Sequence, residues 1–180
     1  MKEVSDMDRR FIEKAAEKLI EEINYCNGEV DIIEVASCLG FKIGNASLSN
    51  NEDGFVIIDK SKSSIFDINT NKLIGVNCNR TLDFKRYVIA HELGQCFLHY
   101  DPKVINGKYA HRLHIKGNNE IDADYFASCL LMPASDFLSK YNELKDKITT
   151  EDTNFLLAKK FNVPSFAVEN RINDITLQLV

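Results

Sequence analysis

The chain has 180 residues, of which 44% are hydrophobic and 27% charged, and this is enough for one compact domain with a core of its own. Its formal net charge is −5, which argues against a general binder of nucleic acids or anionic membranes, because such proteins usually carry a basic surface. No apolar run approaches the ~18 residues of a membrane span, and the first residues lack a secretory signal. The five cysteines form no C-x-x-C pair. We therefore expect a cytoplasmic protein with buried thiols.

The expected helices and strands do not alternate as they would in a βαβ protein. Helical spacing of apolar residues predicts helices over residues 6–25, 30–40, 82–99, 118–133, 134–144, 153–161 and 165–174. β-branched segments between turn residues predict an antiparallel meander over residues 41–44, 54–60 and 72–78. Helices before and after a small sheet indicate an α+β fold. We expect residues 1–150 to form the main domain and residues 151–180 a helix-turn-helix-like appendage packed on it.

The segment RYVIAHELGQCFLHY, residues 86–100, lies in the long central helix, which is apolar on nearly all sides and is therefore predicted to be buried. His91, Gln95 and His99 recur every four residues and lie along one side of it. In an H-E-x-x-H helix, two imidazoles with this spacing bind one zinc ion, and the Glu between them is the base for a bound water. Here Glu92 has the position of the base, but Gln95 replaces the second His. For this segment alone, a buried His and Gln whose polar atoms are satisfied by hydrogen bonds is a more frequent arrangement than a metal site.

A carboxylate in the following helix changes this weighting. Glu120 lies in the first turn of that helix, and a carboxylate from a second helix is the third zinc ligand of gluzincin-type sites. The helix dipole alone also favours an acid near a helix N-terminus. The combination of His91, Glu92 and Glu120 therefore points to a metallopeptidase more strongly than either segment does by itself.

These segments, together with LAKKFNVPSFAVENRI near the C-terminus, resemble the ImmA/IrrE family of bacterial metallopeptidases from the second helix onward. The family pattern is R-x-x-x-A-H-E-L-G-H, then E-x-x-A-N-x-F-A, ending in L-L-M-P. The matching residues are Arg86, His91, Glu92, Leu93, Gly94, Glu120, Ala123, Phe126, Ala127, Leu130, Leu131, Met132 and Pro133. Two positions depart from the pattern: Asp124 stands where the family has Asn, and Gln95 stands where it has the second zinc-binding His.

The resemblance implies a zincin-like fold in which Zn²⁺ is held by His91, Glu120 and residue 95. It assigns to Glu92 the transfer of a proton from the metal-bound water to the leaving amine. It also implies a protein substrate, a helix-turn-helix repressor of mobile-element or stress genes, presented as an extended strand along the sheet edge. Because an amide oxygen is a poorer zinc ligand than imidazole, we expect Gln95 to weaken zinc binding and catalysis.

Three explanations of Gln95 stay open: weak zinc binding with reduced activity, a naturally silenced relative that binds its repressor without cutting it, or an engineered inactive variant, since His and Gln codons differ only at the third base. His99 lies ~12 Å from His91 along the helix and cannot share its metal. His111 and His114, in the connection between the two site helices, are candidates for a substitute ligand or for residues of the substrate cleft.

Two alternatives belong to other functional classes. The first is a non-catalytic antirepressor on the same fold. The second is a DNA-binding regulator that uses the helix-turn-helix pattern of residues 151–180. The candidate recognition helix has one Arg, Arg171, opposed by Glu169, so its attraction for phosphate is expected to be poor and direct nucleic-acid binding is not expected.

Overall fold

The computed structural model describes residues 8–23, 25, 28–59, 70–99, 108–112 and 118–178, with the backbone alone at 108–112, 118, 177 and 178. The helices are α1 (Arg9–Glu22), α2 (Ile32–Cys38), α3 (Leu82–His99), α4 (Asn118–Leu131), α5 (Ala134–Leu144), α6 (Thr150–Phe161) and α7 (Ser165–Gln178). The strands are β1 (Lys42–Ala46), β2 (Gly54–Asp59), β3 (Lys72–Asn77) and β4 (Lys108–Arg112). The predicted α+β class and the predicted helices are confirmed. The division at residue 150 stays a prediction.

The sheet has the order β1-β3-β2-β4, and it is mixed rather than wholly antiparallel. Strand β2 runs antiparallel to both β3 and β4, but β1 runs parallel to β3, with Lys42 opposite Leu73. The antiparallel meander was therefore wrong for β1. The turn residues between β1 and β2 indicate that the chain leaves one strand and starts another, but they do not specify which strands pair. Strand β4 was not predicted, because KYAHR has neither an apolar run nor alternation.

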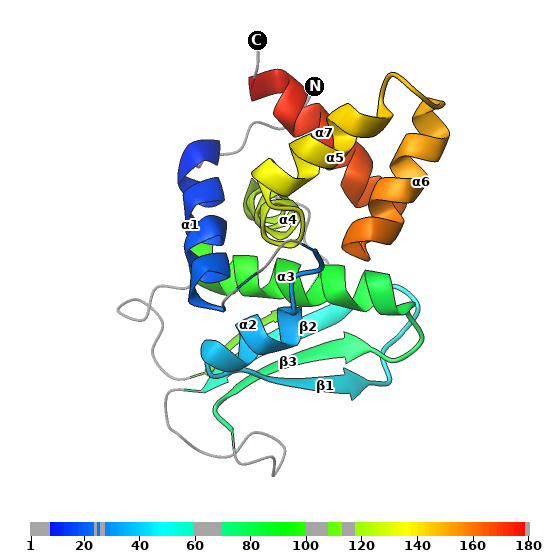
Figure 1. The fold of residues 1–180 in the computed structure, drawn as a ribbon. Coiled ribbons are helices and arrows are strands. Elements are labelled where there is room, and N and C mark those ends of the chain that lie inside the picture. Colours follow the sequence, from blue (N-terminus) through cyan, green and yellow to red (C-terminus); the bar gives the residue numbers. More distant parts are fainter. Residues whose placement is uncertain are drawn as a thin grey trace.

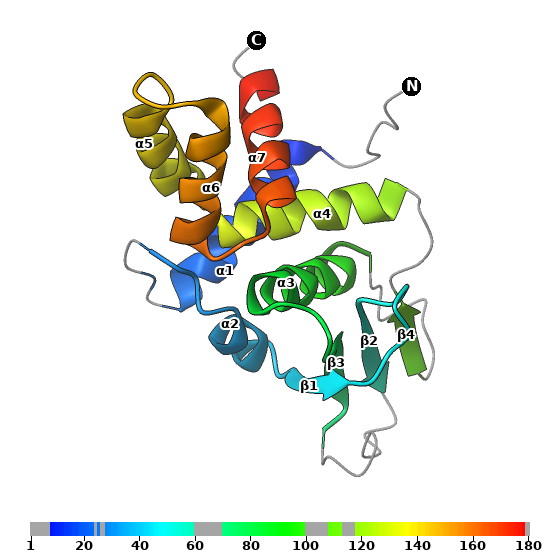
Figure 2. The ribbon, with the colours of Figure 1, turned by 90° about the vertical axis from the view of Figure 1, so that its right-hand side faces the viewer.

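Helix α3 is the centre of the molecule. Figures 1 and 2 show it lying across one face of the sheet, with α4 on its other side and α1, α5, α6 and α7 beyond. Every residue from Tyr87 to Gln95 is buried, as expected for a helix that is apolar all round. Helix and sheet approach closely at Gly54, where a Cβ would lie 2.4 Å from a methyl carbon of Val88. Because glycine has no Cβ, α3 can lie directly on the first residues of β2.

Helices α3 and α4 also cross at very short range. A Cβ on Gly94 would lie 3.0 Å from the ring of Phe126 and 3.2 Å from the Cα and carbonyl oxygen of Ala123. A larger side chain at residue 94 would therefore have to push α4 away. The short distance between the helices explains why a small residue is needed at both Gly94 and Ala123. The same distance determines how closely the polar side chains of the two helices approach one another.

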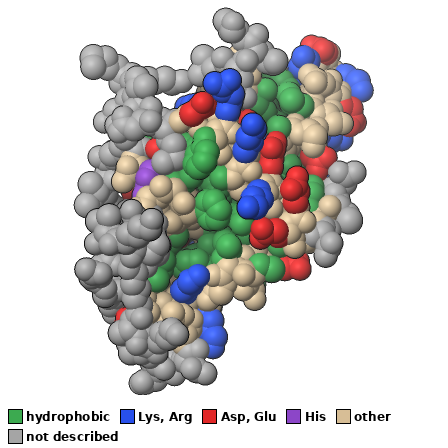
Figure 3. Space-filling view, turned by 90° about the vertical axis from the view of Figure 1, so that its left-hand side faces the viewer, with side chains coloured by type: hydrophobic (Ala, Val, Ile, Leu, Met, Phe, Trp, Pro, Cys, Tyr) green, Lys and Arg blue, Asp and Glu red, His purple; other side chains and the backbone are tan. Residues whose placement is uncertain are grey.

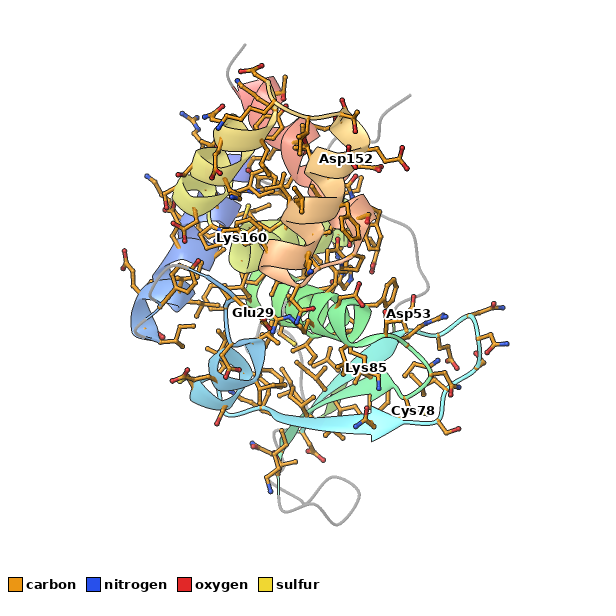
Figure 4. The ribbon with its side chains drawn as sticks, turned by 45° about the vertical axis from the view of Figure 1, so that its right-hand side comes forward. Glu29, Asp53, Cys78, Lys85, Asp152 and Lys160 are labelled. Atoms are coloured by element: carbon orange, nitrogen blue, oxygen red, sulfur yellow. The ribbon has the colours of Figure 1, made fainter. Side chains whose placement is uncertain are left out.

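Two arginines connect the C-terminal helices to the rest of the fold. Arg86 of α3 donates to the backbone oxygens of Asn162 (3.1 Å) and Val30 (2.8 Å), and it pairs with Glu29, which Figure 4 shows beside α3. Asn162 ends α6 in the left-handed conformation, with φ 50°. Arg171 of α7 is fully buried. Both arginines therefore stabilise the packing of α6 and α7.

The surface differs from expectation at the cysteines. Cys129 is buried and Cys96 half-buried, but Cys38 and Cys78 are exposed free thiols, so the prediction of buried thiols was wrong for those two; Cys26 lies outside the described residues. No helix in the described part of the chain has both the length and the apolar character of a membrane span. Figure 3 shows apolar side chains gathered in the middle of one face, bordered by acidic and basic ones. Among the residues that the structure describes, the exposed large apolar side chains are Phe11, Ile33, Leu82, Phe97, Ile148, Phe155, Leu156 and Phe166.

Candidate functional site

The close crossing of α3 and α4 brings two of the predicted site residues together. His91 Nε2 lies 3.0 Å from Glu120 Oε2, and both side chains are largely removed from solvent. His91 comes from the middle of α3 and Glu120 from the first turn of α4. Two residues 29 positions apart therefore point at one spot, which is the arrangement that a shared metal ion requires.

The second nitrogen of the same imidazole is held by α4. His91 Nδ1 lies 2.8 Å from Asp124 Oδ1, and the Tyr87 hydroxyl donates to that oxygen at 3.0 Å. Asp124 follows Glu120 by one helical turn and Tyr87 precedes His91 by one, so each pair shares a helix face. In the sequence, Asp124 stood out only as a departure from the family pattern, and Tyr87 was not predicted to belong to the site. Their spacing of four residues from the predicted ligands was the signal that could have identified both.

The two carboxylates determine the protonation of His91. Burial lowers the pKa of this imidazole, but the hydrogen bonds to Asp124 and Glu120 outweigh burial and raise it to about 9. Burial and the neighbouring Asp124 also raise the pKa of the Tyr87 hydroxyl well above its ordinary value, so Tyr87 remains a hydrogen-bond donor. In the absence of metal, His91 is therefore an imidazolium between two carboxylates at neutral pH.

Gln95 completes this set of contacts as a donor. Its Nε2 donates to Glu120 Oε1 at 2.9 Å and to the backbone oxygen of Asn119 at 3.3 Å. Both neighbours only accept hydrogen bonds, so the nitrogen end of the amide must face them. An amide oxygen that served as a metal ligand would have to replace this nitrogen and would then face two other oxygens.

These residues meet the needs of a zinc ion only in part. Ligands 2.0–2.1 Å from a tetrahedral zinc ion lie roughly 3.3 Å apart, which is close to the 3.0 Å between His91 Nε2 and Glu120 Oε2. A catalytic zinc site uses three protein ligands, however, and no group of three His, Cys, Asp or Glu among the described residues is placed to hold a metal ion. With Gln95 as a hydrogen-bond donor, two ligands remain. The side chains therefore do not fit a catalytic zinc site of the expected kind.

The remaining candidates lie apart from this pair. Glu92 is fully buried, and its Oε1 lies 3.6 Å from where a Cβ on Gly54 would be, so it faces the start of β2. His99 lies 4.0 Å from Asp122, at the end of α3. His111 is opposite Val56 in the pairing of β4 with β2, but its side chain lies outside the described residues, as does all of His114. The roles of His111 and His114 as a substitute ligand or as residues of the substrate cleft stay predictions.

Comparisons with known proteins agree with this architecture. Residues 41–173 match the family of IrrE N-terminal-like domains, a peptidase family. No curated protein matches. Among solved structures, a Mycobacterium tuberculosis transcriptional regulator is similar, with a TM-score of 0.57 and 17% sequence identity over 88% of this chain. This chain spans 45% of the length of that regulator, and the similarity concerns the fold alone.

Proposed function

Because this chain belongs to the family of IrrE N-terminal-like peptidase domains, we propose that it binds a helix-turn-helix repressor protein as an endopeptidase substrate, with zinc-dependent hydrolysis reduced or lost at Gln95. The convergence of His91 Nε2 and Glu120 Oε2 at 3.0 Å carries the proposal. A buried imidazole and a largely buried carboxylate from two helices do not need to meet to stabilise the fold, and their meeting therefore supports a functional site. Glu92, the residue that the family resemblance assigns to proton transfer, follows His91 directly in the chain.

Whether this chain can bind zinc and hydrolyse a peptide bond depends on residue 95. Zinc would supply a Lewis acid and a water of lowered pKa. His91 and Glu120 are the two side chains of the correct type to hold it, but the Gln95 amide donates to Glu120 instead of contributing a third ligand. Since losses even beyond the ligand shell lower metal affinity by roughly 10–100-fold, the loss of a ligand is expected to lower it at least as much.

The sheet offers a place for a polypeptide substrate. Strand β4 is last in the strand order and pairs with β2 on one side, so its other edge has no strand partner within the described part of the sheet. An extended peptide can add to such an edge through backbone hydrogen bonds. Exposed aromatic side chains such as Phe97 and Phe155 also favour a protein partner over a small polar ligand.

Charge argues against DNA as the partner. Arg171, the single Arg of the candidate recognition helix, is fully buried and unavailable to phosphate. Asp152 and Lys160 project from opposite ends of α6 in Figure 4, so the preceding helix is not uniformly basic. As far as the described residues show, these two helices therefore do not supply the basic surface whose electrostatic attraction dominates DNA affinity.

Metal content and cleavage, measured on this chain beside Gln95→His, test the proposal. The candidate substrate is a small helix-turn-helix protein encoded in an adjacent reading frame. We expect zinc near one equivalent, and cleavage of the repressor, only in Gln95→His, and we expect Glu92→Gln in that background to keep the zinc and lose the cleavage. Failure of both forms to bind or cut the repressor would refute the proposal.

The second candidate function is a non-catalytic antirepressor, and the hydrogen bond from Gln95 to Glu120 favours it. In that case the chain and Gln95→His would bind the repressor with equal affinity and neither would cleave it. A pull-down of the repressor at matched concentrations, followed by mass spectrometry of the repressor, separates the two functions.

A further inference from the structure

A cavity lies on the side of α4 that faces α7. It encloses about 200 Å³ and is lined by residues from the start of α1, one face of α4 and the middle of α7. Figure 2 shows α4 between α3 and α7. Asp124 lines the cavity and also contacts His91, so this residue connects the cavity with the meeting point of His91 and Glu120. The lining residues are Arg9, Ile121, Asp124, Tyr125, Ser128, Asn170, Asn173 and Asp174.

Two acids and one arginine line this cavity. Arg9 pairs with Asp174 and lies 4.6 Å over the ring of Tyr125, so its charge is already satisfied. Asp124 has no such partner inside the cavity. Both of its hydrogen bonds, from Tyr87 and His91, end on Oδ1, and its side chain is 49% exposed, which leaves Oδ2 as an acceptor.

A buried hydroxyl points to a ligand independently of the acids. Ser128 is 1% exposed and lines the cavity, and its Oγ makes no hydrogen bond of normal geometry to a described residue, although it lies beside Tyr87. A buried polar atom without a partner is rare and unfavourable, because it has lost water without gaining a hydrogen bond. A ligand that donates to Ser128 would remove this penalty.

From these observations we propose that the cavity between α4 and α7 binds a guanidinium group. Its acceptors, Asp124 Oδ2, Ser128 Oγ and the side-chain oxygens of Asn170 and Asn173, belong to two helices. A planar guanidinium has five N–H donors directed outward and suits such a divided set better than the single point of an ammonium group. The volume suits this group and its methylene stem but is below the range of ordinary small-molecule pockets, which excludes a nucleotide.

The guanidinium can come from an arginine side chain of a protein partner or from free arginine. In either case the ligand and His91 would hold the same carboxylate, the first on Oδ2 and the second on Oδ1, so occupancy of the cavity would be transmitted to the candidate site through Asp124. Binding of a guanidinium in this cavity does not require the chain to cleave a repressor, so either proposal can fail without the other.

Titration of the full chain, followed by NMR of its backbone amides, tests this site. The probes are N-acetyl-arginine amide, free arginine, and N-acetyl-citrulline amide, which has the same shape without the charge. We expect saturable shifts in residues 121–128 and 170–174 with the arginine probes and none with citrulline. A tighter complex with N-acetyl-arginine amide would identify a polypeptide as the source, and a tighter complex with free arginine would identify the small molecule.

Two matched variants complete the test. Ser128→Ala removes the buried hydroxyl with little change in volume, and we expect it to weaken binding by about tenfold, the loss typical of one hydrogen bond to a charged group. Ser135→Ala makes the same change at an exposed position of α5 and should bind like the parent chain. Equal responses to arginine and citrulline, or unchanged affinity in Ser128→Ala, would overturn the proposal.

Discussion

Gln95 Nε2 lies 2.9 Å from Glu120 Oε1, while the other oxygen of the same carboxylate lies 3.0 Å from His91 Nε2. Both oxygens of Glu120 therefore face nitrogen atoms of α3. Hydrogen bonds and an ion pair take the place that a bound cation would have between these side chains. A side chain at residue 95 thus decides whether the site is satisfied without metal or depends on it.

This relationship predicts that zinc will stabilise Gln95→His but not the parent chain. A thousandfold excess of zinc over its dissociation constant adds about 4 kcal/mol to the stability of a protein that binds it only when folded. For a chain of this size, that corresponds to a rise of roughly 10 °C in Tm. Differential scanning calorimetry with and without zinc measures it. Gln95→Leu, which can neither donate to Glu120 nor bind metal, is the control and should show no zinc response. An equal rise in the parent chain would show that Gln95 is an adequate ligand.

The stability of the metal-free protein should depend on pH through His91. The pKa of His91 is about 9 in the folded chain, against about 6.5 when unfolded. A raised pKa means that the protonated form is the more stable one when folded, so the stabilisation is complete below pH 6.5 and is lost between pH 6.5 and 9. Its size is ~3 kcal/mol. Urea unfolding in the presence of a chelator, at pH 6.5 and 9, measures the loss.

The control for the pH prediction is Asp124→Asn, which keeps the shape and removes the negative charge beside Nδ1. We expect this variant to lose less stability than the parent over the same pH range, because its His91 has only one carboxylate partner. If the parent and Asp124→Asn respond identically to pH, Asp124 does not control the protonation of His91.

Much of the site could be predicted from sequence because it rests on helical periodicity. The spacing of His91, Gln95 and His99 specified one face of a buried helix, and α3 has that face. The convergence with Glu120 could not be derived from spacing, because it depends on how two helices cross. The family resemblance supplied it, and the small residues Gly94 and Ala123 explain it physically.

The features that the sequence did not predict correctly also have physical explanations. Strand β1 was expected in a meander, but strand pairing is a long-range property, and local turn residues do not determine it. The role of Asp124 could not be predicted from its own segment, because its contacts, Tyr87 and His91, lie on another helix. The sequence offered Arg171 as the single Arg of a candidate recognition helix, and its burial could not be predicted because it depends on partners in α1 and α4 that are distant in sequence.

Gly94→Ala should destabilise the chain and separate the two site helices. The added methyl group would lie 3.0 Å from Phe126 and 3.2 Å from the backbone of Ala123, and the backbone contact cannot be relieved by a side-chain rotation. Overpacking of this kind typically destabilises by about 1–3 kcal/mol. The matched control is Gly44→Ala in β1, where the new Cβ would lie 3.8 Å from Leu73, an ordinary contact. Chemical unfolding of both variants checks the difference, and equal stabilities would show that α3 and α4 are not in tight contact at Gly94.

Arg171→Met should be among the most destabilising single changes in the C-terminal helices. The buried guanidinium donates to Glu13 Oε1 at 2.8 Å, to the backbone oxygen of Met132 at 3.2 Å and to Cys129 Sγ at 3.1 Å, so its removal leaves several buried acceptors without a donor. Breaking a buried ion pair from one side typically destabilises by about 3–5 kcal/mol. The double variant Glu13→Leu, Arg171→Met should lose less stability than the sum of the two single variants, since the carboxylate and the guanidinium disappear together. Additive losses in urea unfolding would mean that the two side chains do not interact. An exposed, DNA-binding role for Arg171 predicts instead that Arg171→Met leaves stability unchanged and abolishes retention on a DNA column at low salt.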